Sequence, residues 1–191
     1  MTKTLLATLL LPLSLAGCVS IGAKPPASLL SLSAETAPAT GATASGKLND
    51  ALTVLEPTAA AKISVLRVPV QIDATRVAYL KKTMWVERPS RQFQHLLAET
   101  LRARGNRLVT EGDAGTRGPR LSGRLFDMGY DAGARAVVVG FEATRESPNG
   151  TVETKRFAST VPGLDPDAHD IAPALNQAAN DVAKQVADWI G

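Results

Sequence analysis

The chain contains a single cysteine, Cys18, among its 191 residues. An intramolecular disulfide is therefore impossible, and a packed core has to stabilise the fold. A chain of this length is sufficient to build the core of one domain. The formal charge is +3 at pH 7, one unit of which comes from Lys3, and this bias is too small to indicate binding of nucleic acid.

The cysteine follows a segment with the order of regions of a secretory signal peptide. Lys3 supplies a positive charge, and Leu5–Leu15 is a continuous leucine-rich apolar run. The run is shorter than the roughly 20 residues that span a bilayer, and it falls within the 7–15 residues typical of a signal peptide. We therefore expect residues 1–17 to be a signal peptide.

The segment Leu15-Ala16-Gly17-Cys18 resembles the lipobox of bacterial lipoproteins, which are cleaved before the cysteine and acylated on it. A thiolate is a strong nucleophile and suits transfer of a glyceryl group. The alternative is a buried structural cysteine beside a chance apolar run. We expect residues 18–28 to form a lipidated N-terminus and spacer, with covalent lipid on Cys18 and no other cofactor.

The expected anchor predicts where the chain resides. Two or more acyl chains hold a protein stably on a membrane. Residue 19 is Val and not Asp. By resemblance to enterobacterial lipoproteins, in which Asp after the cysteine causes retention at the inner membrane, this favours the periplasmic face of the outer membrane.

Residues 29–191 read as one α/β domain interrupted by a flexible linker at residues 34–46, which is rich in Ala, Thr and Gly. We expect a hairpin that pairs Arg76–Leu80 with Thr83–Pro89 around Lys81-Lys82. Further strands are expected from alternating or β-branched residues. They are Leu29–Leu32, Lys62–Ile72, Arg107–Glu111, Arg120–Asp131, Arg135–Glu146 and Thr151–Val161.

Two helices are predicted from apolar residues at three- and four-residue spacing. The first runs from a capping Ser90 to Arg104, with Gly105 as its left-handed C-terminal cap. The second begins near Asp170, with Pro173 in its first turn. The expected fold is a mixed β-sheet with two main helices packed on it and an antiparallel C-terminal meander.

Enzyme and metal-site hypotheses find little support in the sequence. A zinc site needs about four ligands, and only His95 and His169 remain when Cys18 carries lipid. Residues 165–170, DPDAHD, offer carboxylates for calcium, but a helix N-terminus attracts the same residues. No nucleophile elbow, phosphate loop or dinucleotide-binding turn occurs. We expect the chain not to be an enzyme.

A run of arginines from Arg102 to Arg124 is broken by Glu111 and Asp113. It could meet phospholipid headgroups or an acidic partner. We favour the alternative, a solvated surface on which charges of both signs alternate.

In order along the chain, these motifs resemble the ABC-type transport auxiliary lipoproteins, the group that includes paraquat-inducible protein C. The resemblance rests on the lipobox, Leu30–Leu32, Arg156-Phe157 and the Ala-rich helix ending at Trp189, and above all on the segment Tyr79-Leu80…Trp85-Val86-Glu87-Arg88-Pro89. The long linker departs from the pattern.

The resemblance implies an auxiliary, docking component of an MCE-type ABC lipid transport system. Its partners would be an MCE-domain protein with an inner-membrane permease and ATPase, and a homo-oligomer is possible. We expect Tyr79, Met84 and Trp85 at the partner interface, because aromatic residues are enriched there. The alternative for Trp85 is packing under the first helix. Two other functions stay open: a lipid-binding carrier, and an envelope-assembly lipoprotein unrelated to transport.

Overall fold

The structure is a computed structural model that describes residues 28–105, 107–113, 115 and 117–191. The predictions for residues 1–27, including the lipobox and Cys18, lie outside the described residues. Within the described part of the chain, no helix is long and apolar enough to cross a membrane.

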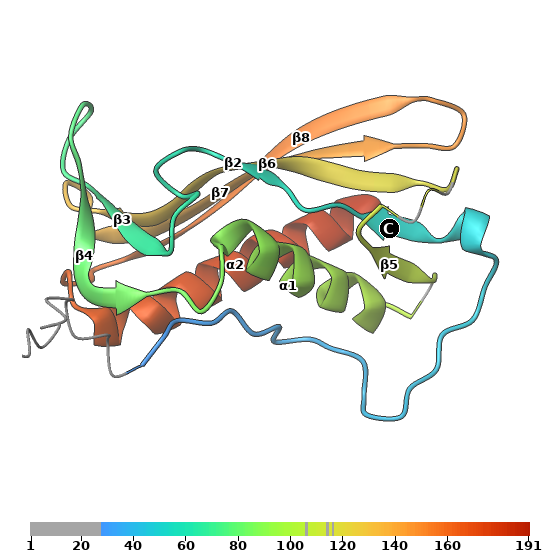
Figure 1. Cartoon of the computed structure of the whole chain (residues 1–191), viewed down its shortest axis with the longest axis horizontal. Helices are drawn as coiled ribbons and strands as arrows, with labels where there is room; N and C mark the ends of the chain where they lie inside the picture. The colour runs from blue at the N-terminus through green and yellow to red at the C-terminus, as the bar shows by residue number, and fades with distance from the viewer. Residues whose placement is uncertain (1–27, 106, 114, 116) are drawn as a thin grey trace, which may run out of the picture.

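One mixed sheet of eight strands carries two long helices on one face (Figure 1). The helices are α1 (Pro89–Ala103) and α2 (Ala168–Ile190), and a short 3-10 helix, η1 (Leu48–Asp50), precedes the first strand. The strands are β1 (Leu52–Val54), β2 (Thr58–Ala59), β3 (Arg67–Gln71), β4 (Val77–Met84), β5 (Val109–Glu111), β6 (Arg120–Asp131), β7 (Ala136–Glu146) and β8 (Val152–Pro162). The predicted fold class is confirmed.

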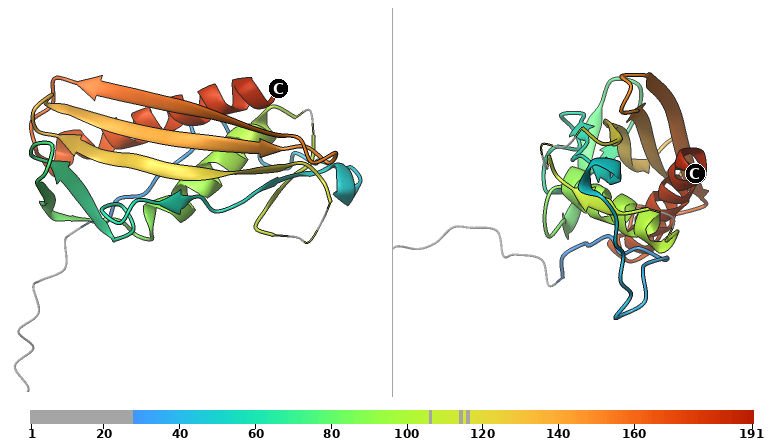
Figure 2. Two further views of the ribbon diagram at one scale, coloured as in Figure 1. Left: turned by 90° about the horizontal axis from the view of Figure 1, so that it is seen from above. Right: turned by 90° about the vertical axis from the view of Figure 1, so that its right-hand side faces the viewer.

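Strand β6 organises the sheet. Along one edge it pairs in parallel with β1, β2 and β3 in succession, so three short strands together match one long one. Along the other edge it pairs antiparallel with β7, and β7 pairs antiparallel with β8. These last three strands form the expected C-terminal meander, which Figure 2 shows from above.

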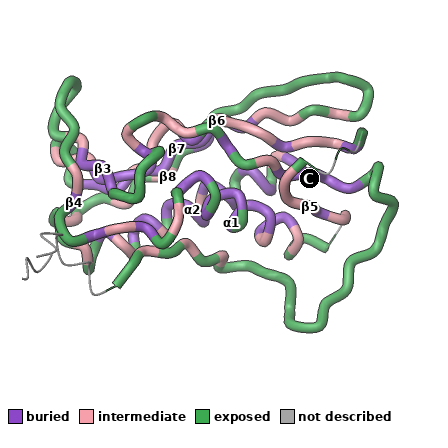
Figure 3. The backbone as a smooth tube through the Cα atoms, in the orientation of Figure 1, coloured by how far each residue is buried: buried purple, intermediate pink, exposed green. Residues whose placement is uncertain are grey.

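The core lies between the sheet and the helices, where Figure 3 shows buried residues on α1, α2 and the strands that they cover. Phe93 on α1 meets Phe141 on β7 edge to face, with ring centroids 5.1 Å apart. Beside them, Gly123 lets the strands approach closely, because an added Cβ would lie 2.2 Å from the carbonyl oxygen of Glu142. The inner face of α2 presents small and branched apolar residues, namely Ile171, Leu175, Ala178, Val182, Val186 and Ile190.

The predicted hairpin around Lys81-Lys82 is wrong, because β4 runs through both lysines as one strand. Lys82 has a φ of 56°, and the pairing of β4 with β3 shifts register beside it. The backbone therefore bulges at the lysines without turning back. The actual hairpin joins β3 to β4, where Asp73 accepts hydrogen bonds from the backbone N–H groups of Thr75 and Arg76.

Two other predicted strands are shorter than expected. Only Arg67–Gln71 of the stretch Lys62–Ile72 is a strand, because the residues before it form a turn in which Ile63 is buried. Leu29–Leu32 makes a single parallel bridge, between Leu30 and Trp85. Residues 34–46 contain neither helix nor strand.

The predicted helix starts also need correction. Arg88 and not Ser90 is the N-cap of α1, because Pro89 occupies its first turn; the Ser90 hydroxyl donates instead to Glu56 at 2.7 Å. Helix α2 begins at Ala168, before Asp170, since the Asp167 carboxylate accepts from the His169 N–H. Pro173 therefore lies beyond the first turn.

Candidate functional site

The three residues expected at a partner interface lie at the end of the sheet formed by β3 and β4. Trp85 is 1% exposed and belongs to the core, whereas Tyr79 and Met84 are half-buried. The indole Nε1–H of Trp85 has no hydrogen-bond partner among the described residues. The surface available to a partner at this place therefore consists of Tyr79 and Met84.

Cations surround Tyr79 and Met84. The Arg67 guanidinium lies 4.4 Å from the centroid of the Tyr79 ring, a cation–π arrangement that fixes the exposed side of the ring. Lys81 and Lys82 are exposed and have no ion-pair partner within the described residues. Exposed apolar residues flank this surface, among them Leu29 and Val86.

An extended arm, which we define as Leu30–Glu35, crosses both helices from this end of the sheet. The Gln92 carboxamide on α1 accepts from the N–H of Leu32 at 2.8 Å. Two carboxamides on α2 continue the pattern: Asn176 accepts from the N–H of Ser33 at 2.9 Å, and Asn180 accepts from that of Glu35 at 2.8 Å. Side-chain amides thus bind the backbone of the arm.

Sequence reasoning missed these carboxamides. The one signal was the spacing of Asn176 and Asn180, four residues apart on a helix whose buried positions are otherwise apolar. Asn180 is 5% exposed, and a buried carboxamide needs partners. Three of its hydrogen bonds are present, two to the arm and one to the carbonyl of Asn176.

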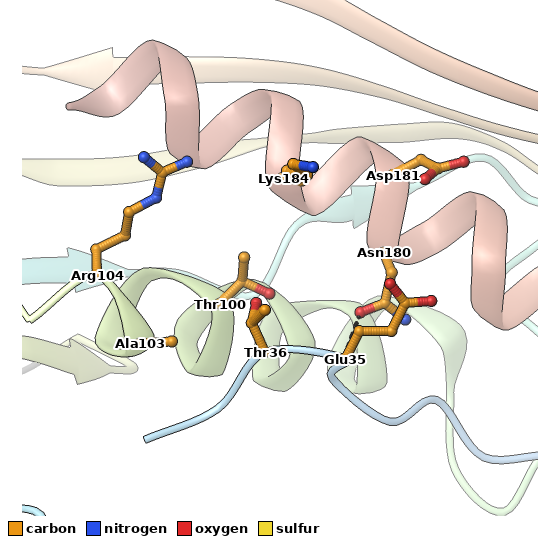
Figure 4. Close-up of a pocket in the computed structure, with 8 residues that line it drawn as sticks. All are labelled: Glu35, Thr36, Thr100, Ala103, Arg104, Asn180, Asp181 and Lys184. Atoms are coloured by element: carbon orange, nitrogen blue, oxygen red, sulfur yellow. Dashed lines mark hydrogen bonds between the residues drawn. The ribbon is translucent and has the colours of Figure 1, made fainter. Parts of the chain in front are cut away.

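A pocket of about 340 Å³ lies where the arm leaves the two helices (Figure 4). Its lining combines the arm with α1 and α2: Glu35, Thr36, Thr100, Ala103, Arg104, Asn180, Asp181 and Lys184. The Thr100 hydroxyl is already engaged with the carbonyl of Leu96. The lining includes both acidic and basic side chains, Glu35 and Asp181 with Arg104 and Lys184.

Arg102, Arg104 and Arg120 of the arginine run form ion pairs. Arg102 bonds Glu99 at 2.6 Å and Glu111 at 2.7 Å, and His95 also pairs with Glu111. Burial alone would lower the pKa of Arg102, but its hydrogen bonds with the two glutamates outweigh that effect and raise the pKa. Arg104 pairs with Asp188. This arrangement agrees with the expected surface of alternating charges.

Elsewhere on the surface, carboxylates accept hydrogen bonds from arginines, which lower the pKa values of the carboxylates. A hydrogen bond from Arg156 lowers the pKa of Glu142, and one from Arg76 lowers that of Asp73. The backbone N–H of Gly115 and the side chain of Arg120 lower the pKa of Asp113. In the part of the chain that the structure describes, no three His, Cys, Asp or Glu side chains gather as a metal site. The capping interpretation of residues 165–170 is confirmed by Asp167.

The described fold and surface define a two-layer α/β domain whose helices hold an N-terminal arm. The family model for the ABC-type transport auxiliary lipoprotein component matches residues 30–187, so the chain belongs to this family. By its description the family is an auxiliary component of ABC-type transport, and an auxiliary lipoprotein of such a system is associated with the cell envelope. A search of the curated proteins found no match.

Two solved structures share the fold. The chain is similar to protein XCC0632 from Xanthomonas campestris, of the DUF330 family, with a TM-score of 0.67 and 18% identity over 85% of this chain and 92% of that one. An uncharacterized protein also has a TM-score of 0.67, with 15% identity over 78% of this chain and 97% of that one.

Proposed function

We propose that the chain is the lipid-anchored docking component of an MCE-type ABC lipid transport system, on the periplasmic face of the outer membrane. The observation that carries the proposal is the family match over residues 30–187. The domain acts without catalysis and without a cofactor other than covalent lipid. Its partners are an MCE-domain protein and, through it, the inner-membrane permease and ATPase.

The proposed site of lipid attachment is Cys18, which is preceded by Leu15, Ala16 and Gly17. Wild-type cells labelled with palmitate should yield a labelled protein in the outer-membrane fraction. Cys18→Ser should lose the label and the membrane association, since the thiol is the acyl acceptor. Label that persists in Cys18→Ser would contradict the anchor, and labelled protein in the inner-membrane fraction would contradict the location.

The docking surface is proposed to include Tyr79 and Met84, which are half-buried beside the exposed Lys81 and Lys82. A Tyr79→Ala/Met84→Ala double variant should lose co-purification with an MCE-domain protein of the same organism. Leu48→Ala is a matched control, because Leu48 is 53% exposed and lies elsewhere, on η1. Equal recovery of the MCE-domain protein with both variants would remove Tyr79 and Met84 from the interface.

A lipid carrier is distinguished by its cargo. The mature Cys18→Ser protein, purified without detergent, should contain no bound phospholipid by mass spectrometry, because charged side chains, among them Glu35, Arg104 and Lys184, line the pocket beside the arm. Stoichiometric phospholipid would favour the carrier function. A chain that binds neither phospholipid nor an MCE-domain protein would instead favour a role in envelope assembly.

A further inference from the structure

The two long borders of the sheet differ. At the β4 border the pairing with β3 shifts register, Lys82 has a positive φ, and two lysines are exposed. A bulge of this kind prevents an edge strand from pairing with another chain. At the β8 border (Figure 2, left) the pairing with β7 is regular from Val152 to Pro162. Strand β8 therefore lacks the bulge that protects β4.

The direction of the backbone groups of β8 follows from its turn. The Ser147 N–H donates to the Thr151 carbonyl at 2.9 Å, so the backbone of Thr151 points toward β7. Because this direction alternates along an antiparallel pair, Val152, Thr154, Arg156 and Ala158 point their N–H and C=O groups away from β7. The Ala158 carbonyl accepts a hydrogen bond from Gln185 on helix α2, as expected if it points away from β7.

Helix α2 covers only the second half of this border. Gln185 donates to the Ala158 carbonyl at 3.3 Å, and Ser159 donates to Asp181 at 2.9 Å. From Val152 to Arg156 every residue is exposed. The free part of the border is thus five residues long, and Thr154 is its midpoint.

We propose that this free stretch pairs antiparallel with the same stretch of a second copy, about a two-fold axis at Thr154. In that register Glu153 of each copy lies opposite Lys155 of the other, on the face of the sheet that carries the helices. Lys155 has no ion-pair partner within the described residues, and its ammonium lies 5.2 Å from the Phe157 ring. Glu153 binds Arg145 through Oε2, which leaves Oε1 for the lysine.

Neighbouring registers are disfavoured by the same residues. An axis at Glu153, Lys155 or Arg156 would place like charges directly opposite each other, which is destabilising. An axis at Phe157 would need the Ala158 carbonyl that Gln185 already occupies. The register at Thr154 joins the two sheets through free backbone groups and two pairs of opposite charges. The pairing involves only two copies of this chain. It can therefore be tested independently of docking to an MCE-domain protein.

Disulfide trapping tests the register in the full-length protein in its membrane. The axis brings Thr154 opposite its own copy, so Thr154→Cys should give a disulfide-linked dimer on a non-reducing gel. Thr160→Cys is the matched control, because Thr160 is exposed on the same strand and points its backbone outward. Thr160 lies far from the axis, so the Thr160→Cys protein should stay monomeric. The wild-type chain controls for Cys18.

A Thr154→Cys protein that stays monomeric, or cross-links no more than Thr160→Cys, would overturn the proposal. A disulfide between Thr154→Cys and a different protein would show that another chain occupies the border, and would overturn it as well.

Charge reversal gives a second test, by analytical ultracentrifugation of the mature protein in detergent. Lys155→Glu should abolish the dimer, because each new carboxylate faces Glu153 of the other copy. The double variant Glu153→Lys/Lys155→Glu should restore it, because the pairs are exchanged. Circular dichroism should show an unchanged fold for Lys155→Glu. Dimers of equal stability in wild type and Lys155→Glu would contradict the register.

Discussion

The Nδ2 group of Asn180 donates a 2.9 Å hydrogen bond to the carbonyl oxygen of Ser33, which precedes it by 147 residues. The Oδ1 atom of the same side chain accepts from the N–H of Glu35 at 2.8 Å. One buried carboxamide on α2 therefore satisfies a donor and an acceptor of the arm together. Leu30, Leu32 and Ala34 of the arm pack their side chains against the core.

Asn180→Ala should destabilise the domain and release the arm. The substitution removes two hydrogen bonds to the arm and one to Asn176, and each bond contributes about 0.5–1.5 kcal/mol. We expect a loss of about 2 kcal/mol in the free energy of unfolding, measured with urea, and faster proteolysis after residue 35. Asn176→Ala removes one bond to the arm and should cost less. Equal effects of the two variants would contradict the central role of Asn180.

Gly123→Ala should be strongly destabilising. The new Cβ would lie 2.2 Å from the Glu142 carbonyl oxygen and 2.6 Å from the Phe141 ring, both within the β6–β7 pair. We expect a cost of about 1–3 kcal/mol, measured by thermal unfolding. Gly46→Ala is the control, because its nearest contact would be an ordinary 3.6 Å from Leu108. A Gly123→Ala protein as stable as Gly46→Ala would show that the strands separate without cost.

Trp85→Ala should reduce stability by about 3–5 kcal/mol, as expected for truncation of a fully buried large aromatic residue. Trp85→Phe should cost less, because it keeps most of the ring volume and removes the unpaired Nε1–H. Urea unfolding followed by circular dichroism measures both variants. If Trp85→Ala were as stable as wild type, the side chain would not be part of the core.

The Glu142–Arg156 pair should make stability depend on pH. The pKa of Glu142 lies below its ordinary value of 4.5, because Arg156 stabilises the carboxylate. The pair therefore stabilises the fold above about pH 4.5, and this contribution disappears as the pH falls through the lowered pKa. The melting temperature of Arg156→Gln should lie below that of wild type at pH 7, and the difference should shrink toward pH 3.

Arg88→Gln is the control for this measurement, since Arg88 is exposed and has no ion-pair partner within the described residues. It removes the same charge and should show no such convergence. A difference between Arg156→Gln and wild type that stays the same from pH 7 down to the acid limit of the folded state would contradict this role of Glu142.

The C-terminal half of the fold could be predicted from the sequence. Strands β6, β7 and β8 were expected to within one residue of their observed ends, because long alternating runs meet at tight turns. The region from Lys62 to Met84 was predicted less well. Two adjacent lysines between apolar segments have the pattern of a turn, and no local signal reveals that Lys82 takes a left-handed conformation within a strand.

The arm and its contacts could not be predicted, for a different reason. Leu30 and Leu32 alternate with polar residues as in a strand, but only Leu30 bonds to neighbouring backbone, and from Leu32 onward the arm bonds to side chains on the two helices. Which carboxamides reach the arm depends on how α2 is rotated against the sheet. Tertiary packing decides that rotation, and neither propensity nor spacing encodes it.

The path of the arm determines how the domain would bear mechanical load. Tension applied before residue 28 first reaches Leu30, whose N–H and C=O are bonded to Met84 and Val86 on neighbouring backbone. Beyond Leu30, the side chains of Gln92, Asn176 and Asn180 accept hydrogen bonds from backbone N–H groups of the arm. A force along the arm would therefore load β4 and the two helices before it reached the pairing of β6 with β7, so these two strands are far from a pull at the N-terminal side.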